Sequence, residues 1–153
     1  MMPRPRGGDW LEDEMLVLRQ MGVSTLLSLL TYPERVELQL DRQWHWCEKY
    51  HINYLNYRIP DCEVPERFYD YHYHVLWLDR ALKAGNKTVV HCRMGIGRTS
   101  MLVAGVMLLN GADPDTVFDR ISAARTLSVP DTAEQRAWVL RHAGQIRYPE
   151  KRG

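Results

Sequence analysis

The chain has 153 residues, which suffices for one domain with a sizeable hydrophobic core. Hydrophobic residues make up 45% of it and charged residues 25%, as in ordinary globular proteins, and no apolar run is long enough to span a bilayer. The formal net charge of +1 provides no overall field that would attract nucleic acid or an anionic membrane surface, so any site for an anion has to be local. We therefore expect a cytoplasmic protein with neither a nucleic-acid nor a membrane partner.

Three cysteines, Cys47, Cys62 and Cys92, are too few for a disulfide framework, and their number is odd. A reducing compartment fits this pattern better than an oxidising one. The basic segment Met1–Arg6 is followed by no apolar region of the kind found in signal peptides, which agrees with the same location.

The first quarter of the chain predicts an arm, a helix and a strand. Residues 1–8 are rich in Pro, Arg and Gly and are expected to be extended. Asp9 and Glu12 have the spacing of a capping box, for a helix that runs to about Met21 and stops at Gly22. The core face of this helix is predicted to carry the apolar residues at helical spacing, Leu11, Met15, Leu18 and Met21.

A buried strand is predicted over residues 23–30, a helical region with room for a break over 33–50, and a second strand over 52–59. Residues 60–65 form a proline-bounded loop. In the helical region three residues are predicted to pack in the interior, namely Trp44, Trp46 and Cys47.

The second half alternates again. A helix is predicted from Pro65 to about Ala84, a strand over residues 88–91 and a buried helix over 98–109. Asp113-Pro114 has the pattern of an N-cap followed by an N1 proline, and predicts a helix to about Arg125. The remaining segments are a loop over 126–131, a helix from about Thr132 to Arg147, and a disordered tail over 149–153. Residues 9–148 thus form one predicted domain.

Alternation of strands and helices favours an α/β fold with a sheet covered by helices on both faces. Anions bind such sheets beyond the carboxyl ends of the strands, and Cys92 falls at one of those ends.

The segment Val90–Thr99 carries the clearest chemistry. It reads as a strand end, a tight loop and a helix start, with Cys92 and Arg98 six positions apart. Main-chain N–H groups at a helix start converge on an anion, and Gly95 and Gly97 let the backbone approach it closely. Arg98 offers a planar fork that matches two phosphate oxygens. The same groups stabilise a thiolate at Cys92, so the pocket that would bind phosphate would also activate its nucleophile.

These residues resemble the motif of the cysteine-dependent protein tyrosine phosphatase superfamily, His-Cys, five residues, Arg, then Ser or Thr. The alternative is a buried cysteine beside an ordinary strand-to-helix turn. The segment from Pro5 to Pro33, with Gly-Gly-Asp-Trp-Leu, also resembles small bacterial and archaeal dual-specificity phosphatases. The resemblance implies a mostly parallel sheet of four or five strands flanked by helices.

Expulsion of an alkoxide or phenoxide from phosphorus needs a general acid. Asp61 lies in the proline-bounded loop, and with Pro65 it looks like the Asp-x-x-x-Pro element of the dual-specificity branch, so we assign it as the acid. Glu63 on the same loop is the nearest alternative, and Asp70 reads as a surface charge. The competing interpretation of Asp61 is a turn residue, since Pro-Asp is common turn chemistry.

The resemblance implies further roles. Ionised Asp61 can act as the base for the water of the second step, Gln135 resembles a water-positioning glutamine, and His91 shapes the loop. Gln135 reads equally well as an ordinary residue in the first turn of a helix. Thr99 can donate a hydrogen bond to the sulfur when it leaves. The substrate-binding residues would be those of the loop, Arg93, Met94, Gly95, Ile96, Gly97 and Arg98.

The expected activity is hydrolysis of phosphate monoesters without a metal or other cofactor, through a cysteinyl-phosphate. The expected substrate is a phosphorylated protein, with phosphotyrosine and also phosphoserine or phosphothreonine accepted by a shallow pocket, and the enzyme is expected to be a monomer. Three alternatives stay open: a non-protein phosphoester (phosphoinositide, inositol phosphate or RNA 5′-phosphate), a phosphate-binding module without turnover, and redox chemistry in which Cys47 or Cys62 resolves an oxidised Cys92.

Overall fold

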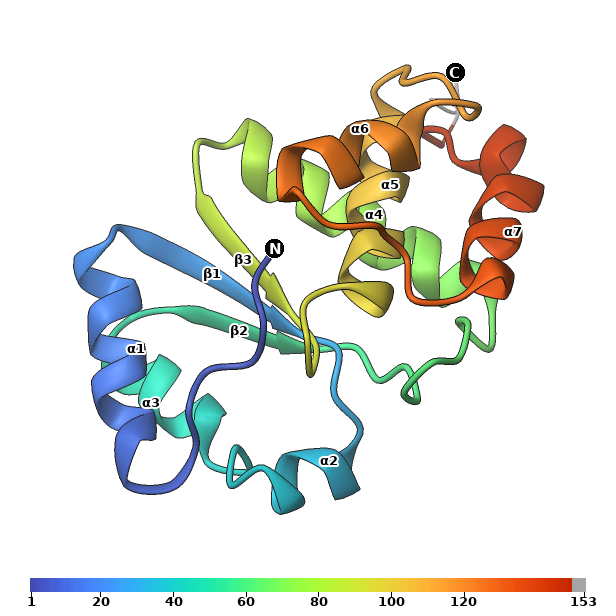
Figure 1. Cartoon of the computed structure of the whole chain (residues 1–153). Coiled ribbons are helices and arrows are strands. Elements are labelled where there is room, and N and C mark those ends of the chain that lie inside the picture. The colour runs from blue at the N-terminus through green and yellow to red at the C-terminus, as the bar shows by residue number, and fades with distance from the viewer. Residues whose placement is uncertain (150–153) are drawn as a thin grey trace.

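The computed structural model describes residues 1–149, and its centre is a parallel sheet with strand order β2-β1-β3 (Figure 1). The strands are β1 (Val23–Ser28), β2 (Asn53–Asn56) and β3 (Lys87–His91). These are the three strands that the apolar runs predict one by one. The expectation of four or five strands, which came from the resemblance alone, is wrong for the described residues. The predicted tail, from residue 150 onward, lies outside the described residues.

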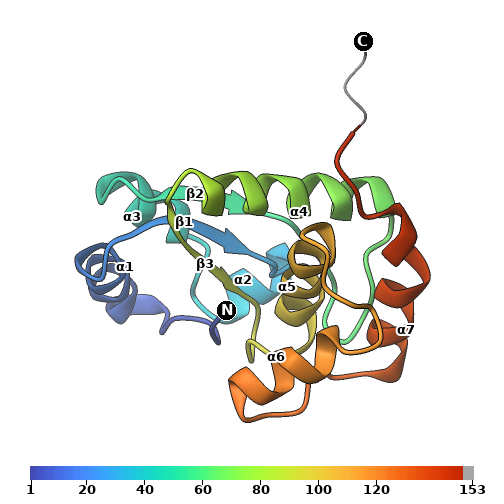
Figure 2. The same cartoon turned by 90° about the horizontal axis from the view of Figure 1, so that it is seen from above.

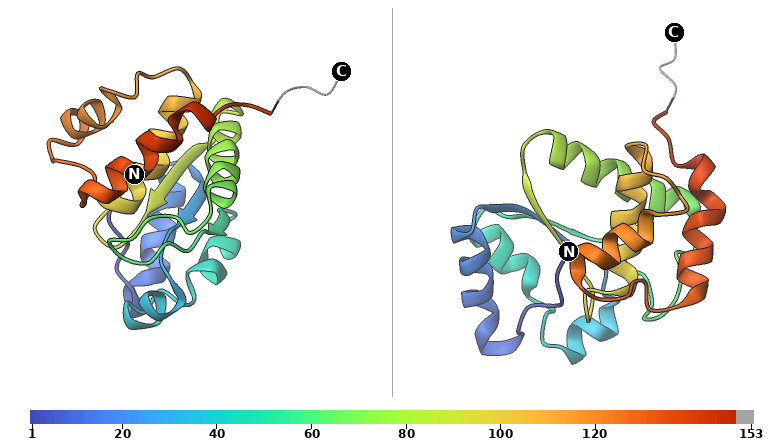
Figure 3. Two further views of the ribbon diagram at one scale, coloured as in Figure 1. Left: turned by 90° about the vertical axis from the view of Figure 1, so that its right-hand side faces the viewer. Right: turned by 45° about the horizontal axis from the view of Figure 1, so that its top comes forward.

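Helices cover the sheet of the described chain on both faces, as predicted (Figures 1 and 2). Helices α1 and α3 lie on one face, α4 and α5 lie on the other, and α6 and α7 pack against α5 (Figure 3). None of the helices in residues 1–149 is long and apolar enough to cross a membrane. The helices are α1 (Leu11–Gln20), α2 (Tyr32–Glu37), α3 (Gln43–Lys49), α4 (Phe68–Lys83), α5 (Gly97–Leu109), α6 (Val117–Arg125) and α7 (Ala133–His142), with 3-10 turns at Gly8–Trp10 and Ala143–Gln145.

The start and end of α1 differ from the prediction. Asp9 lies in a 3-10 turn and its side chain caps nothing, so the expected capping box is absent. Glu12 accepts hydrogen bonds from Lys49 and Tyr50 of the α3 region instead, because this tertiary pairing competes with the local one. Met21 is 58% exposed because the helix ends at Gln20 and turns away at Gly22, whose φ is +85°.

Two other helices begin three residues later than predicted. Helix α4 starts at Phe68 rather than Pro65. Helix α6 starts at Val117 rather than Pro114, because the Asp113 side chain accepts a hydrogen bond from the Asp115 N–H and makes a turn instead of a cap.

The predicted region 33–50 divides into α2 and α3. Thr31 and Glu34 form a capping box at the start of α2 that the sequence interpretation did not identify. Cys47 is buried as predicted, whereas Trp44 is 51% exposed, so the prediction of interior packing is wrong for Trp44.

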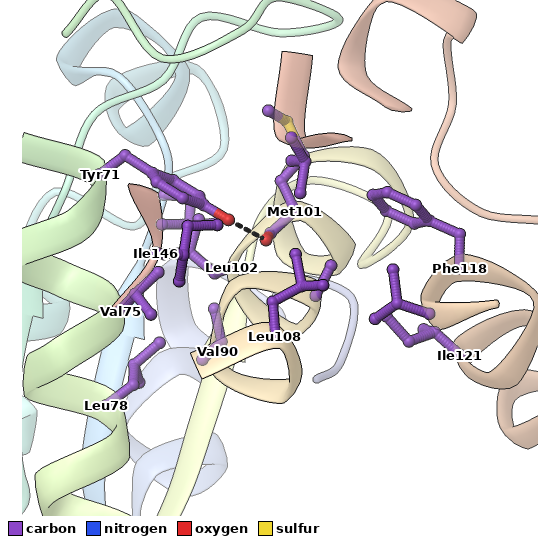
Figure 4. Close-up of a cluster of buried hydrophobic side chains, with 14 of the residues drawn as sticks. Tyr71, Val75, Leu78, Val90, Met101, Leu102, Leu108, Phe118, Ile121 and Ile146 are labelled. Carbon is purple, nitrogen blue, oxygen red and sulfur yellow. Dashed lines mark hydrogen bonds between the residues drawn. The ribbon is translucent and has the colours of Figure 1, made fainter. Parts of the chain in front are cut away.

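Side chains of β1 alternate between two apolar cores. Leu27 packs with α4 and α5, and Leu26 packs with α1 and α3. Figure 4 shows the first core, where the Tyr71 hydroxyl of α4 donates a hydrogen bond of 2.8 Å to the Met101 carbonyl of α5. These cores hold the sheet rigidly between its helices.

The register brings the carboxyl ends of all three strands to one edge. Ser28 lies opposite both Asn56 and His91, so the segments that follow the strands leave the sheet together. The N-terminal arm reaches the same edge (Figure 1): Met2 makes a parallel bridge with His91 and donates to the Val90 carbonyl at 3.0 Å. This edge is where the predicted anion site falls.

Candidate active site

Cys92 lies at the bottom of the loop between β3 and α5 and is 2% exposed. Its sulfur accepts a hydrogen bond of 3.2 Å from the Gly95 N–H. Oγ1 of Thr99, in the first turn of α5, lies 3.9 Å from the sulfur, where its hydroxyl can donate to a thiolate. The loop therefore supplies the environment that the sequence predicts for a nucleophilic sulfur.

The loop needs glycine at position 95 for two reasons. Its φ is +70°, and a Cβ atom there would overlap the backbone of Met2 and Pro3. Arg4 N–H also donates to the Arg93 carbonyl at 3.1 Å. The N-terminal arm thus packs directly against the back of the loop, a contact that composition alone does not indicate.

Arg98 is 1% exposed and lies between two carboxylates. Its Nη1 and Nη2 each donate to Glu34 at 2.9 Å, Nη1 also donates to the Ile59 carbonyl at 2.9 Å, and Nη2 donates to Asp61 Oδ1 at 2.7 Å. Two parallel bonds to one carboxylate fix the plane of the guanidinium group.

Burial disfavours the charged forms of Glu34 and Arg98, yet their hydrogen bonds outweigh it. Bonds from Arg98 and Thr31 lower the pKa of Glu34, and bonds to Glu34 raise the pKa of Arg98. Both groups therefore stay ionised inside the protein. Glu34 is a site residue that the sequence interpretation missed. The signal that could have indicated a fixed carboxylate is the spacing of Thr31 and Glu34, which form the capping box of α2.

The structure places Asp61 on the loop after β2, with half of its side chain exposed and its carboxylate on Arg98. Neither alternative acid is placed in this way. The Glu63 main-chain carbonyl accepts a hydrogen bond from the Gln135 side chain, and Asp70 pairs with Arg67 at 3.5 Å on the surface. Of the three carboxylates, Asp61 is the one in contact with the arginine.

Gln135 is fully buried in the first turn of α7. A Cβ atom at Gly97 would lie 2.7 Å from its Oε1 and would overlap Oδ2 of Asp131, so both side chains lie against the start of α5. Asp131 is a second residue that the sequence interpretation missed, because it had no signal beyond that of a loop residue before a helix.

His91 is completely buried beneath the loop. Its Nδ1 lies 3.2 Å from the Cys92 carbonyl and its Nε2 lies 3.1 Å from Oε1 of Gln43. Burial above all, and then the charge of Arg98, lower the pKa of His91 to about 4 against the opposing hydrogen bond to Cys92. A neutral imidazole thus lies beneath the loop, in contact with the Cys92 carbonyl and Gln43.

The outer side chains of the loop face different surroundings. Arg93 turns toward α2 and pairs with Glu37 at 2.9 Å. Met94 is 61% exposed at the rim, and Ile96 is half-buried. Of these positions Met94 is the one free to meet a bound molecule, while the main chain of Gly95 and Gly97 lines the loop itself.

The arrangement suits chemistry at a phosphorus atom. A cysteine sulfur lies in a loop at a helix start, a buried cation lies at the same loop, and a half-exposed carboxylate reaches that cation. Within residues 1–149 no cluster of His, Cys, Asp and Glu has the form of a metal site.

A family model described as "Polymorphic toxin system, DSP-PTPase phosphatase" matches residues 1–112. The chain belongs to this phosphatase family. Human protein phosphatase Slingshot homolog 2 is 26% identical to it over 131 residues, which are 85% of this chain but 8% of that relative's length. The family model, over residues 1–112, covers the three strands, the loop between β3 and α5, and the helices from α1 to α5.

Three solved structures share the phosphatase fold. Kinase associated phosphatase with serine in place of its catalytic-site cysteine has a TM-score of 0.86 at 16% identity, and the match covers 94% of this chain and 84% of that one. Tk-PTP in its active form has a TM-score of 0.72 at 20% identity, with 94% and 88% covered. PTPMT1 in complex with PI(5)P has a TM-score of 0.74 at 16% identity, with 94% and 88% covered.

Proposed function

We propose that this phosphatase hydrolyses phosphate monoesters of proteins, without a metal, through a phosphate covalently bound to Cys92. The observation that carries the proposal is the convergence of three groups at one loop: the Cys92 sulfur with its main-chain N–H donor, the fixed guanidinium of Arg98, and the Asp61 carboxylate on that guanidinium. Nucleophile, anion binder and acid are the three parts that cysteine-dependent phosphoryl transfer needs.

Substrate binding has to displace Asp61 from Arg98. The guanidinium has five N–H donors, of which Glu34, Ile59 and Asp61 occupy four. A phosphate oxygen takes the place of Asp61 on Nη2, and a second oxygen takes the remaining donor on Nε. The Asp61 carboxylate is then released toward the oxygen that links phosphorus to the substrate, and away from the guanidinium it takes up a proton from solvent.

In the first step the thiolate of Cys92 attacks phosphorus, and the bond from phosphorus to the substrate oxygen breaks. Asp61 gives its proton to that oxygen, so an alcohol or phenol leaves instead of an alkoxide or phenoxide. In the second step water attacks phosphorus, the phosphorus–sulfur bond breaks, and inorganic phosphate leaves. Thr99 donates a hydrogen bond to the departing thiolate, and Gln135 lies beside the loop where this water enters.

Phosphotyrosine is the proposed preferred residue, with phosphoserine and phosphothreonine also accepted. The loop carries no lysine between Cys92 and Arg98, and Arg93 is held by Glu37, so the rim adds little positive charge for a polyphosphorylated lipid headgroup. This supports a protein substrate over a phosphoinositide.

The direct test compares wild type and Asp61→Asn on substrates with good and poor leaving groups, in EDTA. We expect the wild type to release phosphate from both p-nitrophenyl phosphate and an alkyl phosphate. Asp61→Asn should lose roughly 100-fold or more on the alkyl phosphate and much less on p-nitrophenyl phosphate, because p-nitrophenolate leaves without a proton. Equal losses on both substrates would contradict the assignment of Asp61 as the acid.

The substrate class is tested with the same protein on four phosphoesters: tyrosine phosphopeptides, serine and threonine phosphopeptides, phosphoinositide vesicles and RNA 5′-phosphates. The highest kcat/KM is expected for the tyrosine phosphopeptides. A higher kcat/KM for the vesicles or the RNA would overturn the proposal of a protein substrate and leave the chemistry standing.

A further inference from the structure

Two polar side chains, those of Gln135 and Asp131, lie against Gly97 at the start of α5, and they differ in their hydrogen bonds. Gln135 accepts a hydrogen bond from the Thr132 N–H at 3.4 Å and donates through Nε2 to the Glu63 carbonyl at 3.1 Å. It thereby ties α7 to the loop that carries Asp61. One N–H of its amide has no partner among residues 1–149 and remains able to donate.

The Asp131 carboxylate has no such ties. Among the described residues it takes part in no hydrogen bond and no salt bridge, and its Oδ2 lies over the Cα atom of Gly97. Its place beside the N–H groups at the start of α5 is favourable for a negative charge. A bound phosphate repels this charge, so the carboxylate is costly once substrate binds unless it acts on the reaction.

Asp131 and Asp61 both lie at the loop between β3 and α5, Asp131 against Gly97 and Asp61 on the Arg98 guanidinium. The thiol of Cys62, next to Asp61 in the chain, has its pKa raised chiefly by Asp61, then by burial, and also by Asp131. Both carboxylates therefore influence the same exposed side chain, that of Cys62.

We propose that Asp131 is the general base that activates water in the second step, with the free N–H of Gln135 holding the same water. The inference rests on the proposed function, because it concerns the breakdown of its covalent intermediate. Asp131 accepts a proton from the water as the water oxygen bonds to phosphorus. The phosphorus–sulfur bond breaks, its electrons return to Cys92 as the thiolate, and inorganic phosphate leaves.

The two steps then use different carboxylates. Asp61 is displaced from Nη2 of Arg98 by the phosphoryl group and protonates the leaving oxygen in the first step. Asp131 competes for no donor of Arg98, and its lone pairs stay open to solvent throughout the cycle. This differs from the family-based expectation, in which Asp61 serves as acid and then as base.

The test separates the two steps by rapid mixing with p-nitrophenyl phosphate, for wild type, Asp131→Asn and Glu134→Gln. Glu134→Gln is the matched control because it removes the same charge from an exposed side chain three residues later, in the first turn of α7. For Asp131→Asn we expect a full burst of p-nitrophenolate, at the wild-type rate and near one equivalent per enzyme. Steady turnover should then be slower by roughly 100-fold or more, with phosphate retained on Cys92.

Three outcomes decide the matter. Wild-type steady turnover in Asp131→Asn, with no phosphoenzyme retained, would overturn the inference and leave the phosphatase chemistry intact. Loss of the burst together with a lower Tm would mean that Asp131 supports the fold, which also overturns it. Absence of both burst and turnover in the wild type would refute the proposed function itself, and is distinguishable from either.

Discussion

At the scale of single residues, most hydrogen-bonding groups of the site are already engaged by the protein itself. Arg98 donates hydrogen bonds to Glu34, Asp61 and a main-chain carbonyl, and the Cys92 sulfur accepts a hydrogen bond from a main-chain N–H. Phosphate therefore enters by exchange, taking one donor from Asp61 while Glu34 keeps the guanidinium in place. Such preorganisation means that little has to rearrange when the negative charge arrives.

The burial of His91 makes the free energy of unfolding depend on pH. Its pKa is about 4 in the folded protein and near 6.5 in an unfolded chain. Above pH 6.5 neither state binds the proton. Below it the unfolded state does and the folded state does not, so the free energy of unfolding falls from pH 6.5 toward pH 4, by roughly 3 kcal/mol at the limit. His74, whose burial also lowers its pKa, acts in the same direction.

Urea titrations between pH 7.5 and pH 4.5 measure this decline. Wild type should lose stability steadily below pH 6.5, whereas His91→Asn should show a shallower slope over the same range. Parallel slopes for the two proteins would show that His91 is not held neutral by burial.

The residues of the loop were predictable because they are contiguous. Cys92, Arg98 and the glycines between them occupy one short segment, whose spacing alone indicates a phosphate loop. Glu34 and Asp131 come from α2 and from the segment before α7, and they meet the loop only through tertiary packing. The capping-box spacing of Thr31 and Glu34 indicates a fixed carboxylate but not its contact with Arg98, and nothing local distinguishes Asp131 from other carboxylates before a helix.

At the scale of elements, the close approach of α4 and α5 sets the position of the loop. Gly105 lies where the helices meet, and a Cβ atom there would overlap the Tyr71 hydroxyl and lie 2.5 Å from Cγ2 of Val75. Tyr71 in turn bonds the Met101 carbonyl (Figure 4). Glycine thus lets α5 reach the depth at which its first turn meets Cys92.

Gly105→Ala should therefore destabilise the protein by about 1–3 kcal/mol through overpacking. For a chain of this size that lowers Tm by roughly 2–4 °C for each kcal/mol. Gly144→Ala is the matched control, because no atom lies within 4 Å of its Cβ position, and its Tm should stay at the wild-type value. Equal Tm values for the two variants would contradict the packing argument.

Element types were predictable from apolar periodicity, and element ends were not. The strands and helices of residues 1–149 lie close to the segments predicted for them, with α2 and α3 dividing one predicted helical region. The observed helix starts differ from the predicted ones where a side chain expected to cap the helix has another hydrogen-bond partner. Glu12 bonds to Lys49, and Asp113 bonds to a main-chain N–H. Local capping patterns do not contain these tertiary or alternative partners.

At the scale of the whole molecule, parallel strands with aligned ends gather distant segments at one edge. The loop after β3, the loop after β2, the start of α2 and the segment before α7 all reach it, and the N-terminal arm packs behind it (Figure 1). Alternation of strands and helices predicts this edge. The alternation does not predict the number of strands. In the described residues the N-terminal arm adds a single bridge to the sheet and no further strand.

Capture of the covalent intermediate on Cys92 would test the proposed function directly. Wild type and Cys92→Ser are mixed with a radiolabelled phosphotyrosine peptide in EDTA, quenched in acid within one turnover, and mapped by mass spectrometry. We expect phosphate on Cys92 in the wild type, and neither label nor turnover in Cys92→Ser. Turnover that proceeds without label on Cys92, or that survives in Cys92→Ser, would contradict the proposed function.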